Sequence, residues 1–450
     1  MLITGKKRWV ILAVISMLSG LMVFVPYLRF SYYDQMVVVF TQAHNVVDAG
    51  YVNEFIGDTA MVEGLVCMIG YVFGGALADK FKEKYLLVIG GICLGIACVW
   101  FAFVPGQIEI MLINVIMGVG VVFIFSPYLK LVRKLGTGSE QGKMFSTGEF
   151  IRNIMGTAVG FLGSFVLGAA IINGVADPEA MGTQWMITLM IYGIIFFVLS
   201  AITFVLVPAD VMGAEVAEGA EEEASAGFSF DYVKQVVKLP GVWLVAILIF
   251  FCYSFVAVGS GYLGAYTTDV LGIDATTASN YAIIRNYIIA ALSMLLIGIV
   301  ADKIGSRCKT LGIYLALGAI SVALVMLTKN QLFLCIAITF FFAVVFMGMK
   351  GIYFATMSEV GIPVKLTGLA TGIISLICYT PDVFFAKIAG GWLDAFGNAG
   401  YDYIWFYGIA CGVIGIVISL ICVRYAKKIE DRRAGRDELD GNVEIAAAEA

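Results

Sequence analysis

Long apolar runs separated by short polar breaks follow one another along almost the entire chain. A run of about 20 apolar residues is long enough for a helix to cross a bilayer. The runs predict about twelve spans, near residues 9–38, 58–78, 85–104, 108–131, 144–173, 185–207, 242–267, 278–300, 309–328, 332–358, 366–393 and 403–425. The first span could also end sooner, near Arg29, which would leave SYYDQMVVVF outside the membrane. The pattern predicts an all-α polytopic membrane protein.

The longest polar break lies in the middle of the chain and separates six runs from six. It contains AEVAEGAEEEAS, an acidic stretch without aromatic residues that is typical of a solvated linker. FSFDYVKQVVKLPG follows, and it fits either a short helix on the membrane surface or an ordinary lead-in to span seven. We therefore expect a six-helix bundle at 1–207, a linker at 208–240, a second bundle at 241–426 and a disordered tail at 427–450.

The composition agrees with a membrane protein and argues against several other classes. Of the 450 residues, 61% are hydrophobic and 14% are charged, and the mean hydropathy is +0.95, whereas about a quarter of a soluble domain is charged. The net charge is −5, and no basic patch indicates nucleic-acid binding. The nine cysteines are scattered without a C-x-x-C pair, which favours packing roles over a metal site or disulfides. With no nucleotide loop or nucleophile–base pair, we expect neither an enzyme nor a cofactor.

Lysines and arginines predict the orientation of the spans. One alternating set of breaks, together with both termini, holds nearly all of those outside the spans, among them Lys6, Lys7, Arg8, Lys80, Lys82, Lys84, Arg133, Lys134, Lys143, Lys303, Arg307, Lys309, Lys365, Lys427 and Lys428. The opposite breaks hold Lys329. Since positive residues favour the cytoplasmic side, both termini are predicted to be cytoplasmic and the protein to lie in the cytoplasmic membrane.

Two of the positive breaks repeat one pattern. GGALADKFKEK, at residues 74–84, and GIVADKIGSRCK, at residues 298–309, both contain Gly-x-x-x-Asp-Lys, and each lies between the second and third spans of its half. GKMFSTGEF, at the start of span five, has a glycine-punctuated counterpart in TGLATGI at the start of span eleven. Two repeated halves of parallel sense are typical of transporters whose substrate site lies between them, near the bilayer midplane.

These residues resemble the signature cytoplasmic motif of the major facilitator superfamily, and the resemblance extends over nearly the whole chain. It implies two pseudo-symmetric six-helix bundles and alternating access, and we expect the protein to function as a monomer in the lipid bilayer. In the family, the motif joins the two halves while the cytoplasmic side is shut, which implies a latch formed by Gly75, Asp79, Lys80, Gly298, Asp302 and Lys303. Lys82 stands where the first copy of the motif usually has glycine. GKMFSTGEFIR and YTPDVFF are similar to stretches of the sugar-phosphate and organic-anion permeases.

Charged residues inside the spans are candidate site residues, because a charge at the bilayer centre costs about 2.5–3.5 kcal/mol. We selected Arg29, Glu149, Arg152, Arg285, Lys350, Asp382 and Lys387, among which basic residues outnumber acidic ones. A surplus of buried cations facing a central cavity favours an anionic substrate. Glu149 and Arg152, three residues apart, could instead neutralise each other.

The neighbours of these charges suggest their roles. Aromatic residues beside Arg29 can hold its guanidinium toward a cavity, although an arginine at the outer interface would look similar. Arg285 lies deep in span eight, one turn after Tyr281, and is the best anchor candidate. Pro381 breaks span eleven at a plausible gate or site. We therefore expect substrate binding by Arg29, Arg152, Arg285, Lys350, Tyr281 and Tyr379, and ion coupling by Glu149 or Asp382.

The coupling ion and the substrate stay open. His44, the sole histidine, lies in an outside loop, and Asn114-x-x-x-Gly118 stands where many proton-coupled members have Arg-x-x-x-Gly. Proton coupling and anion exchange are both compatible with this sequence. We expect a transporter of a small organic anion such as a sugar phosphate, sugar acid or carboxylate. A transporter of a neutral sugar, nucleoside or drug and a transporter-like solute sensor are the alternatives.

Overall fold

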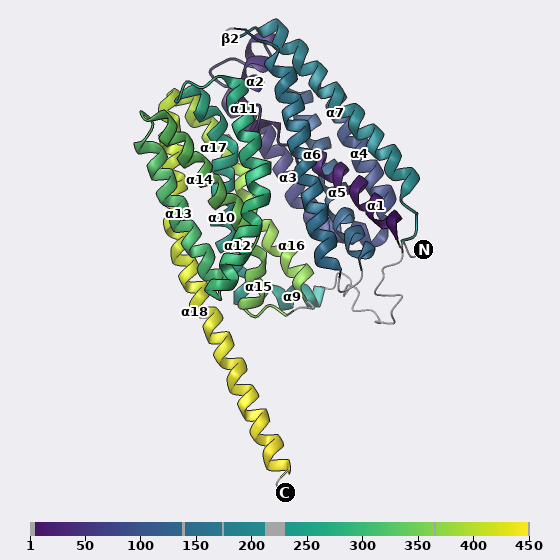
Figure 1. Ribbon diagram of the computed structural model, residues 1–450, viewed down its shortest axis with the longest axis vertical. Coiled ribbons are helices and arrows are strands. Elements are labelled where there is room, and N and C mark those ends of the chain that lie inside the picture. Colours follow the sequence, from purple (N-terminus) through teal and green to yellow (C-terminus); the bar gives the residue numbers. More distant parts are fainter. Residues whose placement is uncertain (1–4, 137–139, 173–174, 212–229, 364–365, 449–450) are drawn as a thin grey trace.

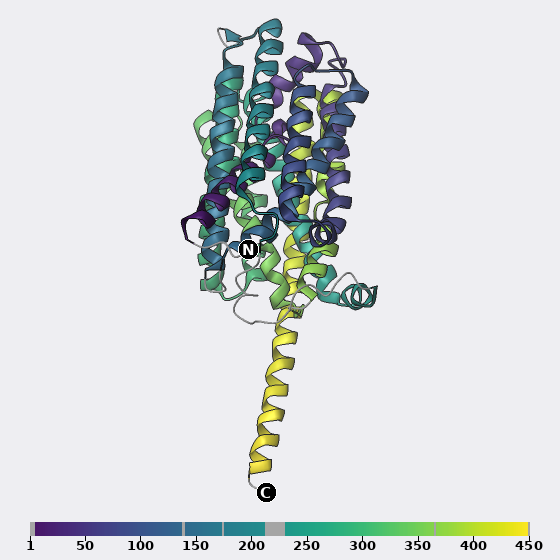
Figure 2. The same cartoon turned by 90° about the vertical axis from the view of Figure 1, so that its right-hand side faces the viewer.

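The chain folds into two helical bundles that stand side by side, as the computed structural model shows in two views (Figures 1 and 2). It describes residues 5–136, 140–172, 175–211, 230–363 and 366–448, and for 72–79, 141–142, 230–232 and 432–448 it describes the backbone alone. Most of the expected linker therefore lies outside the described residues.

The N-terminal bundle contains the first six crossings. Its elements are α1 (Lys6–Met22), η1 (Leu28–Phe30), α2 (Tyr33–Val38), η2 (Val39–Ala43), α3 (Val52–Lys80), α4 (Glu83–Phe101), α5 (Gln107–Leu135), α6 (Gln141–Gly168) and α7 (Pro178–Leu206). A two-stranded antiparallel hairpin, β1 (Ile171–Ile172) and β2 (Val175–Ala176), joins α6 to α7.

The C-terminal bundle contains the other six crossings. Its elements are α10 (Pro240–Asp269), α11 (Ala275–Ile283), η3 (Ile284–Ile289), α12 (Ala290–Ile304), α13 (Arg307–Leu327), α14 (Leu332–Lys350), η4 (Tyr353–Ala355), α15 (Thr356–Glu359), α16 (Thr367–Cys378), α17 (Thr380–Phe396), η6 (Gly397–Ala399) and α18 (Gly400–Ala448). The short helix α9 (Phe230–Val237) precedes it, so a helix does form in FSFDYVKQVVKLPG.

The predicted all-α polytopic fold is confirmed. Within the described part of the chain, nine helical stretches are long and apolar enough to cross a membrane, and one of them, Thr367–Asp431, contains spans eleven and twelve. Two further crossings complete the set of twelve. The first is broken into α1 and α2–η2, and the second is α3, which carries Glu54, Asp58 and Glu63.

Local sequence signals begin and end several of these helices. The side chain of Asp177 accepts a hydrogen bond from the Ala180 amide at the start of α7, and Asp274 does the same for α11. Such caps satisfy amides that have no partner within the helix. Gly305 ends α12 with a φ of 75°, a left-handed conformation in which glycine is favoured.

Four crossings, spans one, eight, ten and eleven, are interrupted inside the membrane region, and span ten breaks at Gly351, between α14 and η4. Span one continues past Arg29 through α2 and η2 to Ala43, so it does not end early. Pro26, which cannot donate a backbone hydrogen bond, lies in the break between α1 and α2. Span eleven breaks between Cys378 and Thr380, beside Pro381, as predicted. Span eight contains the π-helical turn η3, which includes Arg285. Irregular backbone at this depth is tolerated where it is buried in protein or lines a cavity.

We name the two ends of the molecule by their features. The hairpin end carries β1 and β2, and the tail end is the one from which α18 projects (Figure 1). α18 continues as one helix to Ala448, through the residues expected to form a disordered tail. Glutamate, arginine and alanine, which are frequent there, have high intrinsic helix propensity. The cytoplasmic location of the tail end stays a prediction.

Candidate functional site

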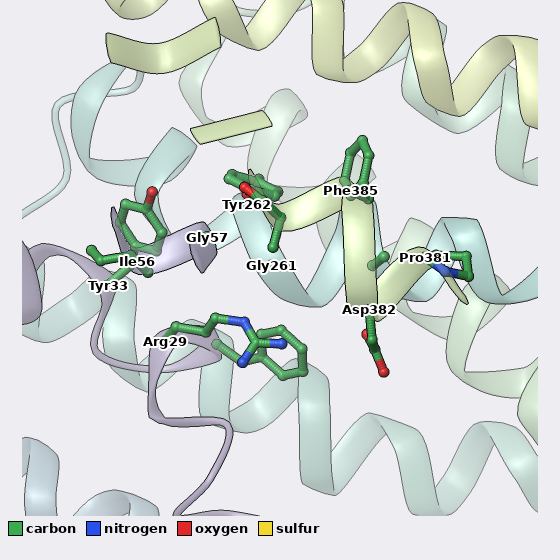
Figure 3. A pocket seen from close by; sticks show the side chains of 12 residues that line it. Arg29, Tyr33, Ile56, Gly57, Gly261, Tyr262, Pro381, Asp382 and Phe385 are labelled. Atoms are coloured by element: carbon green, nitrogen blue, oxygen red, sulfur yellow. The ribbon is translucent and has the colours of Figure 1, made fainter. Parts of the chain in front are cut away.

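A cavity lies between the two bundles, where the broken first span faces α3, α10 and α17 (Figure 3). It encloses about 330 Å³ of empty space, part of it open to solvent, and is lined by Arg29, Phe30, Tyr33, Ile56, Gly57, Ala257, Gly261, Tyr262, Pro381, Asp382, Phe385 and Ala386. Both bundles contribute residues. The position matches the one expected for a substrate site between two repeated halves.

Arg29 lines this cavity from η1, and the residue as a whole is 8% exposed. The centre of its guanidinium lies 4.6 Å from the ring centroid of Phe30 and 5.4 Å from that of Tyr27. These distances are within the range of cation–π interactions. Arg29 is therefore held among aromatic rings inside the protein, and it does not reach the membrane surface.

Glu63 is the partner of Arg29, and the sequence analysis overlooked it. It lies on α3 and is 1% exposed, and its Oε2 is 3.6 Å from Nη1 of Arg29. Neither of its carboxylate oxygens accepts a hydrogen bond from the described residues. The sequence could have indicated Glu63 as a candidate site residue, because it is a charged residue inside the run 58–78 that predicts the second span.

The surplus of buried cations is smaller than the sequence indicated. Arg29 lies beside Glu63, and Arg152 donates a hydrogen bond to Glu149 on the same helix, as the spacing allowed. Lys387 Nζ is 2.6 Å from Oδ1 of Asp58 and 3.5 Å from Oε1 of Glu54. The count from sequence had left out Asp58 and Glu63, both inside the predicted second span.

Asp382 and Lys350 bring charge from the C-terminal bundle. Asp382 lines the cavity, and its Oδ2 accepts a hydrogen bond of 2.6 Å from the hydroxyl of Tyr253. Lys350, at the end of α14, lies close enough to interact electrostatically with Asp382 and with Arg152. No described carboxylate lies within 4.0 Å of the Lys350 ammonium.

Tyrosines surround these charges. The hydroxyls of Tyr379 and Tyr353 are 3.0 Å apart. The ring of Tyr379 packs against that of Tyr253 at 4.7 Å and lies 6.2 Å from that of Tyr71, on the other bundle. Phenol hydroxyls can both donate to and accept from a polar solute. The structure therefore brings Tyr379 and Asp382 into one polar cluster with Tyr253.

Arg152 and Glu149 lie on α6. Arg152 is 8% exposed and packs over the ring of Tyr128 at 5.2 Å, whereas the side chain of Glu149 is 46% exposed. Their hydrogen bond makes them an internal pair, the alternative left open by the sequence. Arg152 remains within electrostatic reach of Lys350.

Arg285 and Tyr281 are not among the residues that line the cavity. Arg285 is 2% exposed and donates one hydrogen bond of 3.2 Å from Nη1 to the hydroxyl of Thr339. Its guanidinium lies 5.7 Å from the ring centroid of Phe340, which also packs against Tyr281. Nη2 has no hydrogen-bond partner among the described residues. The best anchor candidate from sequence is thus enclosed within the C-terminal bundle.

The expected latch residues lie at the tail end. Gly75 and Asp79 are described by their backbone alone, and Lys80 and Lys303 are exposed. Asp302 is 3.6 Å from Arg307 and 76% exposed at its side chain, and a Cβ at Gly298 would meet no atom within 4 Å. Glu359 instead makes the close contacts here, accepting hydrogen bonds from the amides of Arg307 and Cys308 at the start of α13.

A family model described as Major Facilitator Superfamily matches residues 12–386. The chain belongs to the major facilitator superfamily. Its fold and family are those of multi-pass membrane transporters, as the repeated motif indicated. In the part of the chain that the structure describes, no cluster of three or more His, Cys, Asp or Glu could hold a metal ion.

Curated relatives and solved structures agree with this assignment. The chain is 25% identical to the inner membrane protein YqcE and 26% identical to the inner membrane protein YihN, both of Escherichia coli (strain K12). The matches cover 94% and 95% of this chain, and 95% and 97% of those proteins.

Among solved structures, a D-xylose-proton symporter has a TM-score of 0.69 at 18% identity, covering 92% of this chain and 97% of that one. A bacterial homolog of the human lysosomal transporter Spinster, inward-facing and occupied, has a TM-score of 0.68 at 13% identity, covering 95% and 98%. At these identities the two structures establish the shared fold.

Proposed function

We propose that this protein is a secondary transporter that moves a small organic anion across the cytoplasmic membrane by alternating access. The observation that carries the proposal is a pair of cations from opposite bundles, the buried Arg29 at the cavity and the half-buried Lys350 beside Asp382. Lys350 has no described carboxylate in contact, and the Glu63 carboxylate is 3.6 Å from Arg29, beyond hydrogen-bonding distance. An anion between the bundles would satisfy both cations.

The chemistry of the lining favours a solute that also carries hydroxyl groups. The planar guanidinium of Arg29 can bind a carboxylate or phosphate with two parallel hydrogen bonds. Asp382 lines the cavity from the C-terminal bundle, and the rings of Tyr33 and Tyr262 line it with hydroxyls that donate hydrogen bonds to Asn53 and to the Ala386 carbonyl. Sugar acids, sugar phosphates and hydroxycarboxylates combine both features.

The arrangement of the two bundles supports alternating access. The empty space of about 330 Å³ between the lining residues includes space open to solvent, and in this conformation the cavity has no room for a sugar-sized molecule. A sugar-sized anion would therefore need the bundles to separate on one side before it could enter. Because the site is built from both bundles, such a rocking motion would also expose it.

Binding and transport measurements test the proposal. We expect glucose 6-phosphate, D-gluconate or another member of an anion panel to raise the melting temperature of the purified protein, because ligand binding stabilises the folded state. Arg29→Ala and Lys350→Ala should each abolish uptake into proteoliposomes while the protein remains in the membrane. Lys329→Ala, which changes an exposed lysine far from the cavity, is the matched control. Full transport by both Arg29→Ala and Lys350→Ala would contradict the proposal.

A neutral solute is the second candidate, and the paired charges favour it. If Arg29–Glu63 and Arg152–Glu149 persist during transport, they would leave little net charge for an anion to neutralise. The solved relative named a D-xylose-proton symporter carries a neutral sugar. Competition between glucose and glucose 6-phosphate distinguishes the two candidates. Deletion of the residues after Lys428 would silence a solute sensor and leave a transporter active.

A further inference from the structure

We propose that Glu63 is the proton-binding residue that couples anion movement to proton movement, and this rests on the proposed anion transport. When the cavity is empty, the Glu63 carboxylate is ionised and balances Arg29. When an anion occupies Arg29, Glu63 takes up one proton and becomes a neutral carboxylic acid. One proton and one negative charge then enter the cavity together, so its net charge does not change.

The surroundings of Glu63 distinguish it from the other two acidic candidates. Glu149 is half-exposed and hydrogen-bonded to Arg152, and Asp382 accepts a hydrogen bond from Tyr253. Glu63 is 1% exposed, and neither of its oxygens accepts a hydrogen bond from the described residues. A buried carboxylate without donors depends on a nearby cation to remain charged.

Arg29 is the cation that can meet this requirement. The groups that act electrostatically on Glu63 are Arg29 and Tyr27 from the first span, Asp382 from α17, and Cys67 and Tyr71 from α3 itself. Arg29 is the one positive group in this set. The negative charge of Asp382 opposes ionisation of Glu63. Loss of Arg29 to a bound anion would therefore favour protonation.

A second cavity offers the proton a polar environment. It encloses about 300 Å³ of empty space, lies within the N-terminal bundle, and reaches Arg29 from a different set of residues. Thr59 and Asn114 contribute polar groups to its wall, and Thr59 lies one helical turn before Glu63 on α3. Thr59 and Glu63 thus share a face of the helix. Beside these polar groups the cavity has room for about one water molecule, which could carry a proton toward Glu63.

Infrared difference spectroscopy of the purified full-length protein, titrated with alkali, tests the assignment without any substrate. At acidic pH, wild type should show the C=O stretching band of a protonated carboxylic acid, sensitive to D2O, and this band should disappear as the pH rises and Glu63 becomes ionised. Glu63→Gln should lack this band, whereas Asp382→Asn and the exposed control Glu109→Gln should retain it. In Arg29→Gln the band should persist to about one to three pH units higher, the usual effect of losing a close opposite charge. A band that survives in Glu63→Gln, or is absent from wild type, would overturn the proposal.

Addition of glucose 6-phosphate and of D-gluconate links the titration to transport. Whichever of the two binds should restore the band in wild type at a pH where it had disappeared, and should have no such effect in Glu63→Gln. Binding without any change in the band would also overturn the coupling role. If neither compound nor any other anion of the panel binds, the anion-transport proposal fails, while the substrate-free titration still decides whether Glu63 takes up a proton.

Discussion

At the hairpin end, α3 and α17 pack backbone against backbone and are joined by ionised side chains, whereas toward the tail end such links between the bundles are missing among the described side chains. A Cβ at Gly57 would overlap the backbone at Ala386 and Lys387, and one at Gly390 would overlap that of Asn53. Asp394 accepts hydrogen bonds from the amides of Asn53 and Glu54 at 3.2 and 2.7 Å. The carboxylate of α17 thus caps the first turn of α3.

Other polar contacts between the bundles follow the same distribution. Thr268 donates a hydrogen bond of 2.6 Å to Asp34, and Ser164 donates one of 2.7 Å to Asn280. All of these residues lie in the half of the molecule nearer the hairpin. The hairpin end is therefore closed in this conformation. Opening it must separate glycine-mediated helix packing, a helix cap and an ion-pair cluster.

The state of the hairpin end can be followed with one reporter. Ile56 lines the cavity and is 1% exposed, so a cysteine at this position is shielded from the hairpin side while that end is closed. A membrane-impermeant maleimide, added to right-side-out or inside-out vesicles, measures its accessibility from each side. Most native cysteines are buried and serve as the background.

Among the variants considered, Gly390→Leu should open the hairpin end most and so give the largest increase in maleimide labelling. The side chain would have to displace the backbone of α3, and overpacking of this kind costs about 1–3 kcal/mol or more. We expect the maleimide reaction at Ile56→Cys to rise by roughly 10- to 100-fold from the hairpin side, since 1.4 kcal/mol is a factor of ten. Uptake should fall because the cavity no longer closes on that side.

The neighbouring glycine is the control. A Cβ at Gly391 would lie 3.7 Å from the Glu54 carboxylate, which is an ordinary contact, so Gly391→Leu should change the labelling little. Equal labelling in Gly390→Leu and Gly391→Leu would show that close packing of α3 against α17 does not keep the hairpin end closed.

Asp394→Ala should have an intermediate effect. It removes the acceptor for two backbone amides and for the side-chain amide of Asn53, which lies at 2.7 Å. Loss of a helix cap costs about 0.5–2 kcal/mol, which corresponds to a roughly 2- to 30-fold rise in labelling. Asp394→Asn is the matched control, because asparagine also caps helices well and should restore most of the closure. Labelling of Asp394→Ala at the wild-type rate would mean that the cap does not stabilise the closed end.

The fold could be predicted from sequence because each membrane-spanning helix leaves a long apolar run in the sequence. The bilayer requires about 20 apolar residues per crossing, and the repeated Gly-x-x-x-Asp-Lys pattern fixed the two halves. The break at Pro381 was also predictable, because proline cannot donate the missing backbone hydrogen bond. The continuation of span one beyond Arg29 was left open, since PYLRFSYYD contains neither a full apolar run nor a clear polar break.

The site could be predicted only in part, because depth in the membrane does not reveal which way a side chain faces. Arg29 and Arg285 both lie inside spans and beside aromatic residues. One reaches the cavity and the other is enclosed near Thr339, a difference that depends on helix rotation within each bundle. Lys387 and Asp58 form an ion pair across the bundles although they are 329 positions apart in the chain. The residues next to each of them in the sequence do not indicate that pairing.

Lys387→Met should have the smallest effect on the closed end. Its ammonium contacts Asp58 and Glu54, but the Lys387 side chain is 40% exposed, and ion pairs this accessible contribute about 0–1 kcal/mol. We expect labelling at Ile56→Cys to rise by no more than about fivefold. Salt screens exposed charges, so raising the salt concentration should increase labelling of wild type toward that of Lys387→Met and leave the variant unchanged. Lys329→Met provides the control for loss of an exposed lysine at the same end. If salt increases the labelling of Lys387→Met as much as that of wild type, other residues must provide the electrostatic part of the closure. Glycine packing and the Asp394 cap would then be the contacts that distinguish the two ends.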